Sequence, residues 1–311
     1  FLFVRSAGER LEVEFVDPNA PAGGSAQTIA PTAASAPTTG DLRALLWSPD
    51  ASRASLDTLR STLDVLLDTI AGDNWQDARN ADFGAMNASD FWSRPERFDT
   101  LDRIERRNRI ESALDTVQRL DERLARDGGN ALFVARTAQT LWLIGLAIDA
   151  LAERRPQDAL LALSASDTEL RRDPARTRLW WQQLLAMYMA WAERRNMRVD
   201  VLEQKPDACR ARLAISGFGA HDLLQPEHGL HVFEHDHDGD DAPRRSTLAV
   251  RIAPDLPGRT RIDPLKADDD LRICRRYRAE PSPLARDSVR SWRTGRLDRV
   301  LGGEFDVIVG E

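Results

Sequence analysis

The chain has 311 residues, of which 42% are hydrophobic and 30% are charged, so it can bury one large core or two smaller ones. Its formal net charge of −7 argues against general affinity for nucleic acids, because phosphate binding depends on clustered Lys and Arg, although a local basic patch is compatible with RNA binding. We expect no segment of membrane-spanning length, and the two cysteines, Cys209 and Cys274, fit no metal-ligand spacing.

Residues 1–40 form the first predicted segment. Residues 1–19 have the pattern of a strand or hairpin that could be the end of a larger unit. Residues 18–40 are rich in Ala, Pro, Gly, Ser and Thr, a composition that is typical of a flexible linker.

Residues 41–154 are predicted to form a helical domain. Leucines at helical spacing between residues 42 and 70 predict two helices, the second of which begins at Ser55 or Asp57. Further on, a charged helix with one apolar face follows Ser93, which we expect to cap it.

In that charged helix Pro95 suits the first turn, and Gly128-Gly129 is expected to end the helical pattern. Residues 131–154 then predict a more apolar partner helix. Its apolar run from Leu141 to Ile148 is too short to span a bilayer and predicts a packed hairpin helix.

The helical pattern around which the rest of the chain is organised lies at Leu179–Asn196. Its apolar stripe is wider than a surface helix needs, so we expect burial on more than one side, and Asn196 can adopt the left-handed conformation that ends a helix. A long helix packed on an antiparallel sheet is the simplest core for this region, and the predicted fold class is α+β. The strand patterns that follow the helix are at residues 197–202, 211–215, 230–233 and 247–252.

Three blocks of the sequence carry recognisable motifs. They are Trp92 to Arg97 before the charged helix; MYMAWAERRN followed by Gly229-Leu230-His231; and the closing series Arg286-Asp287, Thr294, Val300-Leu301, Gly303 and Phe305-Asp306. Together they resemble bacterial class-I peptide chain release factors, of the kind that reads UGA and UAA, over about residues 88–311. Thr168-Glu169 match the end of that family's Gly-Gly-Thr-Glu loop without its glycines, so we expect a different loop path.

Composition and apolar spacing for residues 1–87, together with the resemblance for residues 88–311, predict three parts of the chain. Residues 1–40 are a strand and linker, residues 41–154 are the helical domain, and residues 155–311 are similar to the codon-recognition superdomain of the family.

The family's codon-reading residues are replaced. In an ungapped placement, His237, Asp238 and Gly239 stand where the resembled factors have Ser-Pro-Phe, and Ser246 stands where they have a codon-stacking His. Aspartates at 236, 238, 240 and 241 would repel RNA, so we expect no stop-codon decoding.

The predicted RNA contacts are basic and hydroxyl side chains near this loop and in the closing segment. The candidates are Arg244, Arg245, Thr247, Arg286 and Arg293, within a wider set that also includes Arg272, Arg275, Arg276, Arg290 and Arg296.

The resembled family inserts a domain bearing Gly-Gly-Gln, which positions water for ester hydrolysis, after the position of Pro254. Here only residues 255–270 separate two matching flanks, and the printed sequence has no Gly-Gly-Gln. So short a segment cannot fold a core. The resemblance therefore implies that this chain is not itself an enzyme.

The histidines suggest a rival site. All five lie between residues 221 and 237 beside acidic residues, and imidazole with carboxylate suits zinc, manganese or iron. His231, His235 and His237 are the candidate ligands. The alternative is a polar loop whose histidines gain charge as the pH falls towards 6.

The favoured function is that of a cytoplasmic, release-factor-like protein of translation termination or rescue. The resemblance implies ribosome and rRNA binding at the small-subunit decoding site. We separately expect a protein partner for residues 1–154, no membrane or DNA partner, and no cofactor apart from a divalent metal at the histidines. Two alternatives stay open: an interaction scaffold that kept the fold and lost ribosome binding, and a metal-dependent protein that uses the His221–Asp241 cluster.

Overall fold

The structure is a computed structural model. It describes residues 2–7, 10–15, 39–127, 130–235, 245–258, 260–261, 264 and 270–308. The chain divides into two compact units, residues 1–35 and residues 36–311. In the first unit, β1 (Leu2–Ala7) and β2 (Arg10–Phe15) pair as an antiparallel hairpin.

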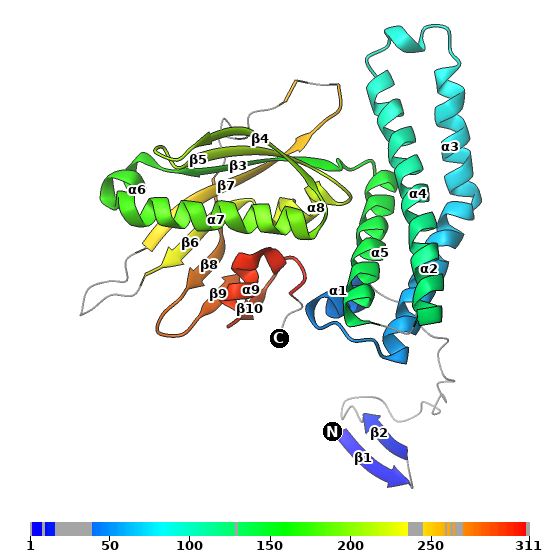
Figure 1. Cartoon of the computed structure of the whole chain (residues 1–311), viewed down its shortest axis with the longest axis horizontal. Helices are drawn as coiled ribbons and strands as arrows, with labels where there is room; N and C mark the ends of the chain where they lie inside the picture. Colours follow the sequence, from blue (N-terminus) through cyan, green and yellow to red (C-terminus); the bar gives the residue numbers. More distant parts are fainter. Residues whose placement is uncertain are drawn as a thin grey trace, which may run out of the picture. The chain divides into compact units, whose positions relative to one another are not determined.

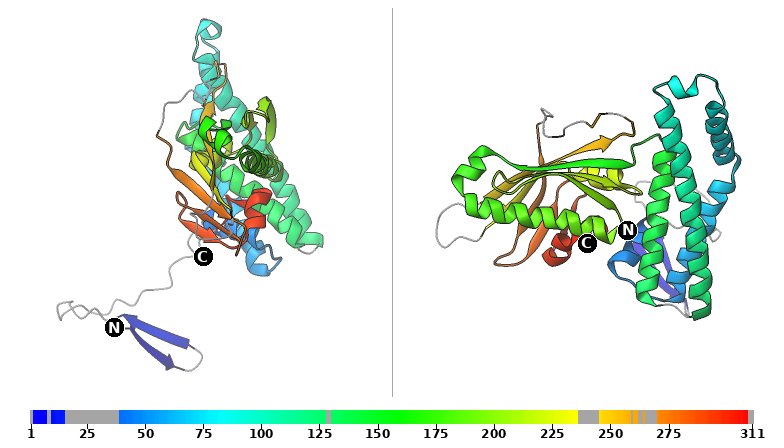
Figure 2. Two further views of the ribbon diagram at one scale, coloured as in Figure 1. Left: turned by 90° about the vertical axis from the view of Figure 1, so that its left-hand side faces the viewer. Right: turned by 45° about the horizontal axis from the view of Figure 1, so that its top comes forward.

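The second unit begins with helices that gather at one end of a large sheet (Figures 1 and 2). The third of them is not predicted from the sequence, because only Trp75 and Asp82 of its residues are buried and its apolar repeat is therefore weak. The helices are α1 (Thr39–Trp47), α2 (Arg53–Ala71), α3 (Asp73–Met86), α4 (Arg97–Asp127) and α5 (Ala131–Ala152).

Two predicted helix starts are wrong. Helix α2 begins after Ser52, whose Oγ accepts a hydrogen bond from the Ser55 amide at 3.2 Å. Helix α4 begins at Arg97 rather than after Ser93, because Phe91–Ser93 form the short 3-10 turn η1 and the Ser93 hydroxyl donates to the Asp90 carbonyl at 2.7 Å. In both places a nearby serine or aspartate competes for the local hydrogen bonds.

Helix α5 corrects the expectation that no segment reaches membrane-spanning length. By length and composition alone this helix could cross a membrane. Within the unit, however, its apolar side chains pack against other helices, and Val134, Ile144 and Ala147 are fully buried. These contacts are those of a core helix, as its apolar pattern predicts.

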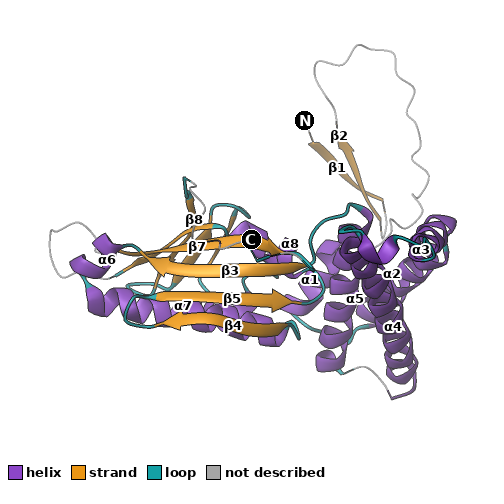
Figure 3. Cartoon of the chain, turned by 90° about the horizontal axis from the view of Figure 1, so that it is seen from above, coloured by secondary structure: helices purple, strands orange, loops and turns teal. Residues whose placement is uncertain are grey.

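The sheet has eight strands in the order β10-β9-β8-β6-β7-β3-β5-β4, and Figure 3 shows its central strands lying over one long helix. All neighbours are antiparallel except β6 and β8, which are parallel, so the predicted antiparallel sheet is wrong for this pair. The connection after β7 carries β8 past β6 to its far side. The strands are β3 (Asp158–Ala165), β4 (Arg198–Lys205), β5 (Arg210–Ser216), β6 (Gly229–Glu234), β7 (Arg245–Asp255), β8 (Ile273–Arg278), β9 (Leu284–Asp287) and β10 (Trp292–Thr294).

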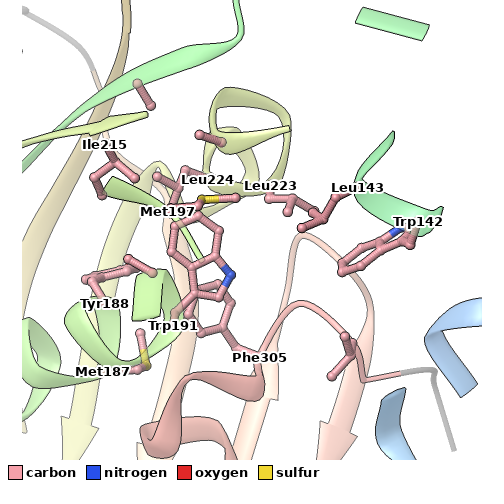
Figure 4. Packing of buried hydrophobic residues seen from close by; sticks show 14 of the residues in the cluster. Trp142, Leu143, Met187, Tyr188, Trp191, Met197, Ile215, Leu223, Leu224 and Phe305 are labelled. Atoms are coloured by element: carbon pink, nitrogen blue, oxygen red, sulfur yellow. The ribbon is translucent and has the colours of Figure 1, made fainter. Parts of the chain in front are cut away.

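Helix α7 (Pro174–Arg194) crosses one face of this sheet and confirms the α+β fold (Figures 1 and 3). Its buried stripe is wide, as predicted, and Asn196 ends the helix with a positive φ of 53°. Around Trp191, Figure 4 shows Phe305, Met197 and Tyr188 packed together. The buried residues of α7 are Thr177, Trp180, Trp181, Leu184, Leu185, Met187, Tyr188, Trp191 and Ala192.

The closing segment contains α9 (Leu297–Arg299) and η4 (Val300–Glu304) and packs against the end of α7. Gly303 has φ +88°, and a Cβ there would lie 2.4 Å from the Trp191 amide nitrogen, so only glycine fits. Asp306 accepts hydrogen bonds from Trp191 Nε1 at 2.8 Å and from Arg195 at 2.6 and 2.8 Å. Gly303 and Asp306 therefore have a structural role in holding the closing segment against α7.

Candidate functional site

The Thr168-Glu169 pair lies at the start of α6 (Asp167–Arg172), beside the first residues of β7. Ser166 caps the helix by accepting from the Glu169 amide at 3.2 Å. The Glu169 carboxylate accepts from the Thr247 amide at 3.0 Å and from Arg172 at 2.7 Å. Glu169 therefore fixes the place where β7 begins, which is a structural role.

Ser246, the residue at the expected position of the codon-stacking His, points into the protein. It is 1% exposed, and its hydroxyl lies 2.8 Å from His235 Nε2. The His235 ring packs on Phe233 with centroids 5.0 Å apart. His237, Asp238 and Gly239, the equivalents of the codon-reading tripeptide, lie outside the described residues.

The RNA-contact candidates divide by exposure. Arg286 on β9 and Arg293 on β10 are exposed, whereas Thr247 is half-buried. The Arg245 side chain is 48% exposed and lies 3.9 Å from a Glu234 oxygen. Arg244 lies outside the described residues.

In the wider arginine set Arg275 is buried and Arg290 is half-buried, and both are engaged in ion pairs inside the protein, so that part of the prediction is wrong. Arg275 is fully buried, with Nη2 2.6 Å from both Glu227 Oε1 and Asp287 Oδ2. Arg290 pairs with the same Glu227 carboxylate and donates to the Leu223 carbonyl at 2.7 Å. Desolvated guanidinium groups need such partners, which is why both arginines face inward.

The Glu227 carboxylate of this buried network is ionised. Burial alone would raise the pKa of Glu227, but the Arg275 and Arg290 guanidinium groups outweigh it and hold that pKa at about 2. Asp287 also accepts from the amides of Val289 at 2.9 Å and Arg290 at 2.6 Å. Two carboxylates and two guanidinium groups balance each other, so the network carries no net charge.

His231 completes the network as a neutral side chain. Burial lowers its pKa to about 4. Its Nε2 lies 3.0 Å from the Glu227 carbonyl oxygen, which can only accept, so Nε2 carries the proton and Nδ1 accepts from the Tyr277 hydroxyl at 2.9 Å. Both ring nitrogens of this metal candidate are thus engaged by protein groups. Of the other two candidates, His235 bonds Ser246 and His237 lies outside the described residues.

Two carboxylates of the network also lie close to a thiol, so that three possible metal ligands come together. Among the described residues, Glu227, Cys274 and Asp287 each place one ligand atom within 4.8 Å of the others. The two guanidinium groups already neutralise these carboxylates, and burial raises the pKa of the Cys274 thiol far above its ordinary value. The sequence offers a signal for Asp287, in the Arg-Asp motif, but none for Glu227.

A cavity of about 770 Å³ lies where the start of α4 meets residues 151–158 and the ends of β4 and β7. Arg106 in its wall is 4% exposed and donates to the Arg155 carbonyl at 3.1 Å. Around the cavity, arginines and aspartates pair with one another, as Arg198 does with Asp200. Arg261 pairs with Asp255 in the same way, whereas Nε and Nη2 of Arg106 have no hydrogen-bond partner within the described part of the chain.

Comparison with known proteins gives one consistent family. The model of the PCRF domain matches residues 175–250. Peptide chain release factor 2 of Pseudothermotoga lettingae is 33% identical over 100 residues, which are 30% of this chain and 27% of that protein, so the match spans about a quarter of the relative's length. The structure of RF2 of Thermus thermophilus aligns with a TM-score of 0.39 and 14% identity over 76% of this chain and 94% of that one. The chain is therefore release-factor-like, as its motifs predict.

Proposed function

We propose that this release-factor-like chain associates with the ribosome at or near the decoding site, in termination or rescue, without itself hydrolysing peptidyl-tRNA. The observation that carries the proposal is the PCRF match over residues 175–250, which covers α7 and strands β4 to β6. Those strands belong to the eight-stranded sheet that α7 crosses, and the exposed arginines of β9 and β10 belong to the same sheet.

Codon reading is not part of this proposal. A codon-stacking residue must reach a base, yet Ser246 is buried and bonded to His235. The substitution of His237, Asp238 and Gly239 for the codon-reading tripeptide supports the same view. We expect binding that does not depend on the codon in the decoding site.

Hydrolysis is likewise excluded from the proposed role, because residues 256–272 alone join β7 to β8 in the printed chain. We expect the protein to act in the cytoplasm, with a protein partner at residues 1–154 as the source of any hydrolysis. No cofactor, membrane or DNA is required by this role.

The test is co-sedimentation of the purified chain with intact bacterial ribosomes and separated subunits at low and moderate salt. Wild-type protein should pellet with ribosomes and their small subunits in a salt-sensitive way, and Arg244→Glu/Arg245→Glu should weaken pelleting at least about tenfold, because each change reverses a charge facing phosphate. Arg119→Glu/Arg126→Glu on the exposed side of α4 is the control with the same charge change.

No pelleting of wild-type protein at low salt would overturn the proposal and favour the scaffold alternative. A stoichiometric metal in the purified protein, lost on replacing His235 and His237 with Gln, would favour the metal-dependent alternative. A peptide-release assay on the bound ribosomes should show no release above background.

A further inference from the structure

We infer that an in-register row of three arginines on the outer face of β8, β9 and β10 binds the phosphate backbone of RNA. We call Arg276, Arg286 and Arg293 the arginine row. This inference deepens the proposed function, on which it rests for the nature of its partner, by naming the surface that makes the contact.

Strand pairing places the three side chains together. Arg276 on β8 is the register partner of Arg286 on β9, and Arg286 is the register partner of Arg293 on β10. Directly opposite residues share one face of a sheet, and neighbouring strands lie about 4.8 Å apart. The three strands form one margin of the sheet (Figure 1), and Arg286 and Arg293 are exposed there.

On the inner face of the same strands, an arginine pairs with a carboxylate instead of another arginine. There Arg275 pairs in register with Asp287, and Asp287 with Trp292. The Arg275 guanidinium binds the Asp287 carboxylate at 2.6 and 3.0 Å and lies 4.9 Å from the Trp292 ring centroid. Inner positions are thus charge-matched, whereas adjacent outer positions carry like charges only.

Like charges directly opposite each other on neighbouring strands destabilise a sheet. One carboxylate reduces the charge repulsion at one end of the arginine row, because Glu234 lies 3.4 Å from Arg276. The same Glu234 carboxylate also lies 3.9 Å from Arg245. In the described part of the chain, no carboxylate forms an ion pair with Arg286 or Arg293. An external anion would therefore bind here and relieve the repulsion.

The spacing favours a polyanion over a single small anion. Three guanidinium groups set one strand apart extend over roughly 10 Å, and each can hold a phosphate through two N–H donors. In register with Arg276 lie Val232, which is buried, and then Thr247, which is half-buried and whose hydroxyl suits a phosphate or a ribose 2′-OH. None of these five side chains is aromatic, so contact should be to the backbone with little sequence preference.

The test measures binding of a fluorescein-labelled RNA hairpin to the full chain by anisotropy over a range of salt concentrations. Arg286→Gln/Arg293→Gln should weaken binding at least about tenfold at low salt and reduce the slope of log K against log salt by about 1.5, because two phosphate contacts are lost. Arg119→Gln/Arg126→Gln, which removes the same charge from α4, should change neither value.

A second readout tests the repulsion itself. Without RNA, Arg286→Gln should raise Tm relative to Arg119→Gln, and added RNA should raise the Tm of wild type more than that of the row variant. Unchanged RNA affinity in the double variant would overturn the inference, as would equal binding of a labelled poly-glutamate peptide, which would assign the row to an acidic protein.

The ribosome experiment separates this inference from the proposed function. If the row variant pellets with ribosomes as well as wild type does, the row is not the contact surface although ribosome association stands. If wild type binds the RNA hairpin through the arginine row but never pellets with ribosomes, the inference of RNA binding by the row is supported and the proposed function is overturned.

Discussion

Two neighbouring buried side chains, His231 and Glu227, titrate far from their ordinary ranges for different reasons. Burial keeps His231 neutral, with a pKa near 4 instead of 6.5. Glu227 stays ionised in spite of burial because Arg275 and Arg290 hold its pKa at about 2. The folded core therefore holds His231 neutral and Glu227 ionised, and lowering the pH should destabilise the fold in two successive steps.

The first step gives a prediction about pH. Between pH 6.5 and about 4 the unfolded chain protonates His231 while the folded chain does not, so stability is complete above pH 6.5 and falls as the pH drops through this window. The shift corresponds to a loss of about 3 kcal/mol. The free energy of unfolding, measured with a denaturant between pH 4 and 7, should show this loss in wild type. In His231→Gln the free energy of unfolding should depend less on pH.

His235 provides the control, because burial lowers its pKa in the same direction but it is only partly buried. His235→Gln should flatten the profile less than His231→Gln does. Equal profiles for wild type and His231→Gln would show that His231 is not the titrating group. A further loss between pH 4.5 and about 2 should then belong to Glu227.

At the scale of the element, β8 separates two kinds of arginine on adjacent residues. Arg275 points into the ionic network, and Arg276 points outward with a side chain that is 35% exposed. The alternation of side chains along a strand makes one of them structural and leaves the other available for binding.

This contrast predicts different stability costs for the same substitution. Arg275→Met should destabilise the protein by about 3–5 kcal/mol, because it leaves Glu227 and Asp287 buried with Arg290 as their remaining guanidinium. Arg276→Met should cost about 1 kcal/mol or less, since its one ion pair is exposed to solvent. Urea unfolding of both variants at pH 7 measures the difference; equal costs would mean that the inner network does not stabilise the fold.

The same strand shows how far sequence reasoning extends. Periodicity predicts α7 and strands β4 to β7, because those signals are local, and Asn196 ends α7 as its chemistry predicts. Nothing local distinguishes Arg275 from Arg276, and the partner Glu227 lies 48 residues away along the chain. The parallel pairing of β6 with β8 is equally non-local. The burial of Ser246 also depends on non-local contacts, so the local sequence does not predict it.

At the scale of the whole molecule, the helices and the sheet of residues 36–311 share one core. Buried residues from Leu42 in α1 to Ile308 at the end of the described chain belong to a single cluster. Polar contacts reinforce it: Arg299 Nη1 donates to the Trp47 carbonyl at 2.9 Å, and its guanidinium lies 3.5 Å from the Trp47 ring centroid.

We therefore expect residues 36–311 to unfold in one cooperative transition. Calorimetry of the full chain should give one main peak whose calorimetric and van't Hoff enthalpies agree. Arg299→Ala should lower the Tm of that peak without splitting it, whereas Arg126→Ala on the exposed side of α4 should leave it in place. Two separated peaks, one for the helices and one for the sheet, would contradict the shared core.

The parallel pairing of β6 and β8 has a consequence for how this chain tolerates change in length. Val250 of β7 and Ile273 of β8 flank the first residues of β6, and β7 then runs on to Asp255. The end of β7 therefore lies two strand spacings to the side of the start of β8 and further along the strand direction, roughly 20 Å in all, which about six or seven extended residues can bridge. Because β6 sets the register of β8, the length of the connection does not affect the sheet. A domain could therefore be gained or lost in evolution between β7 and β8, or inserted there experimentally, without changing which strands pair in the sheet.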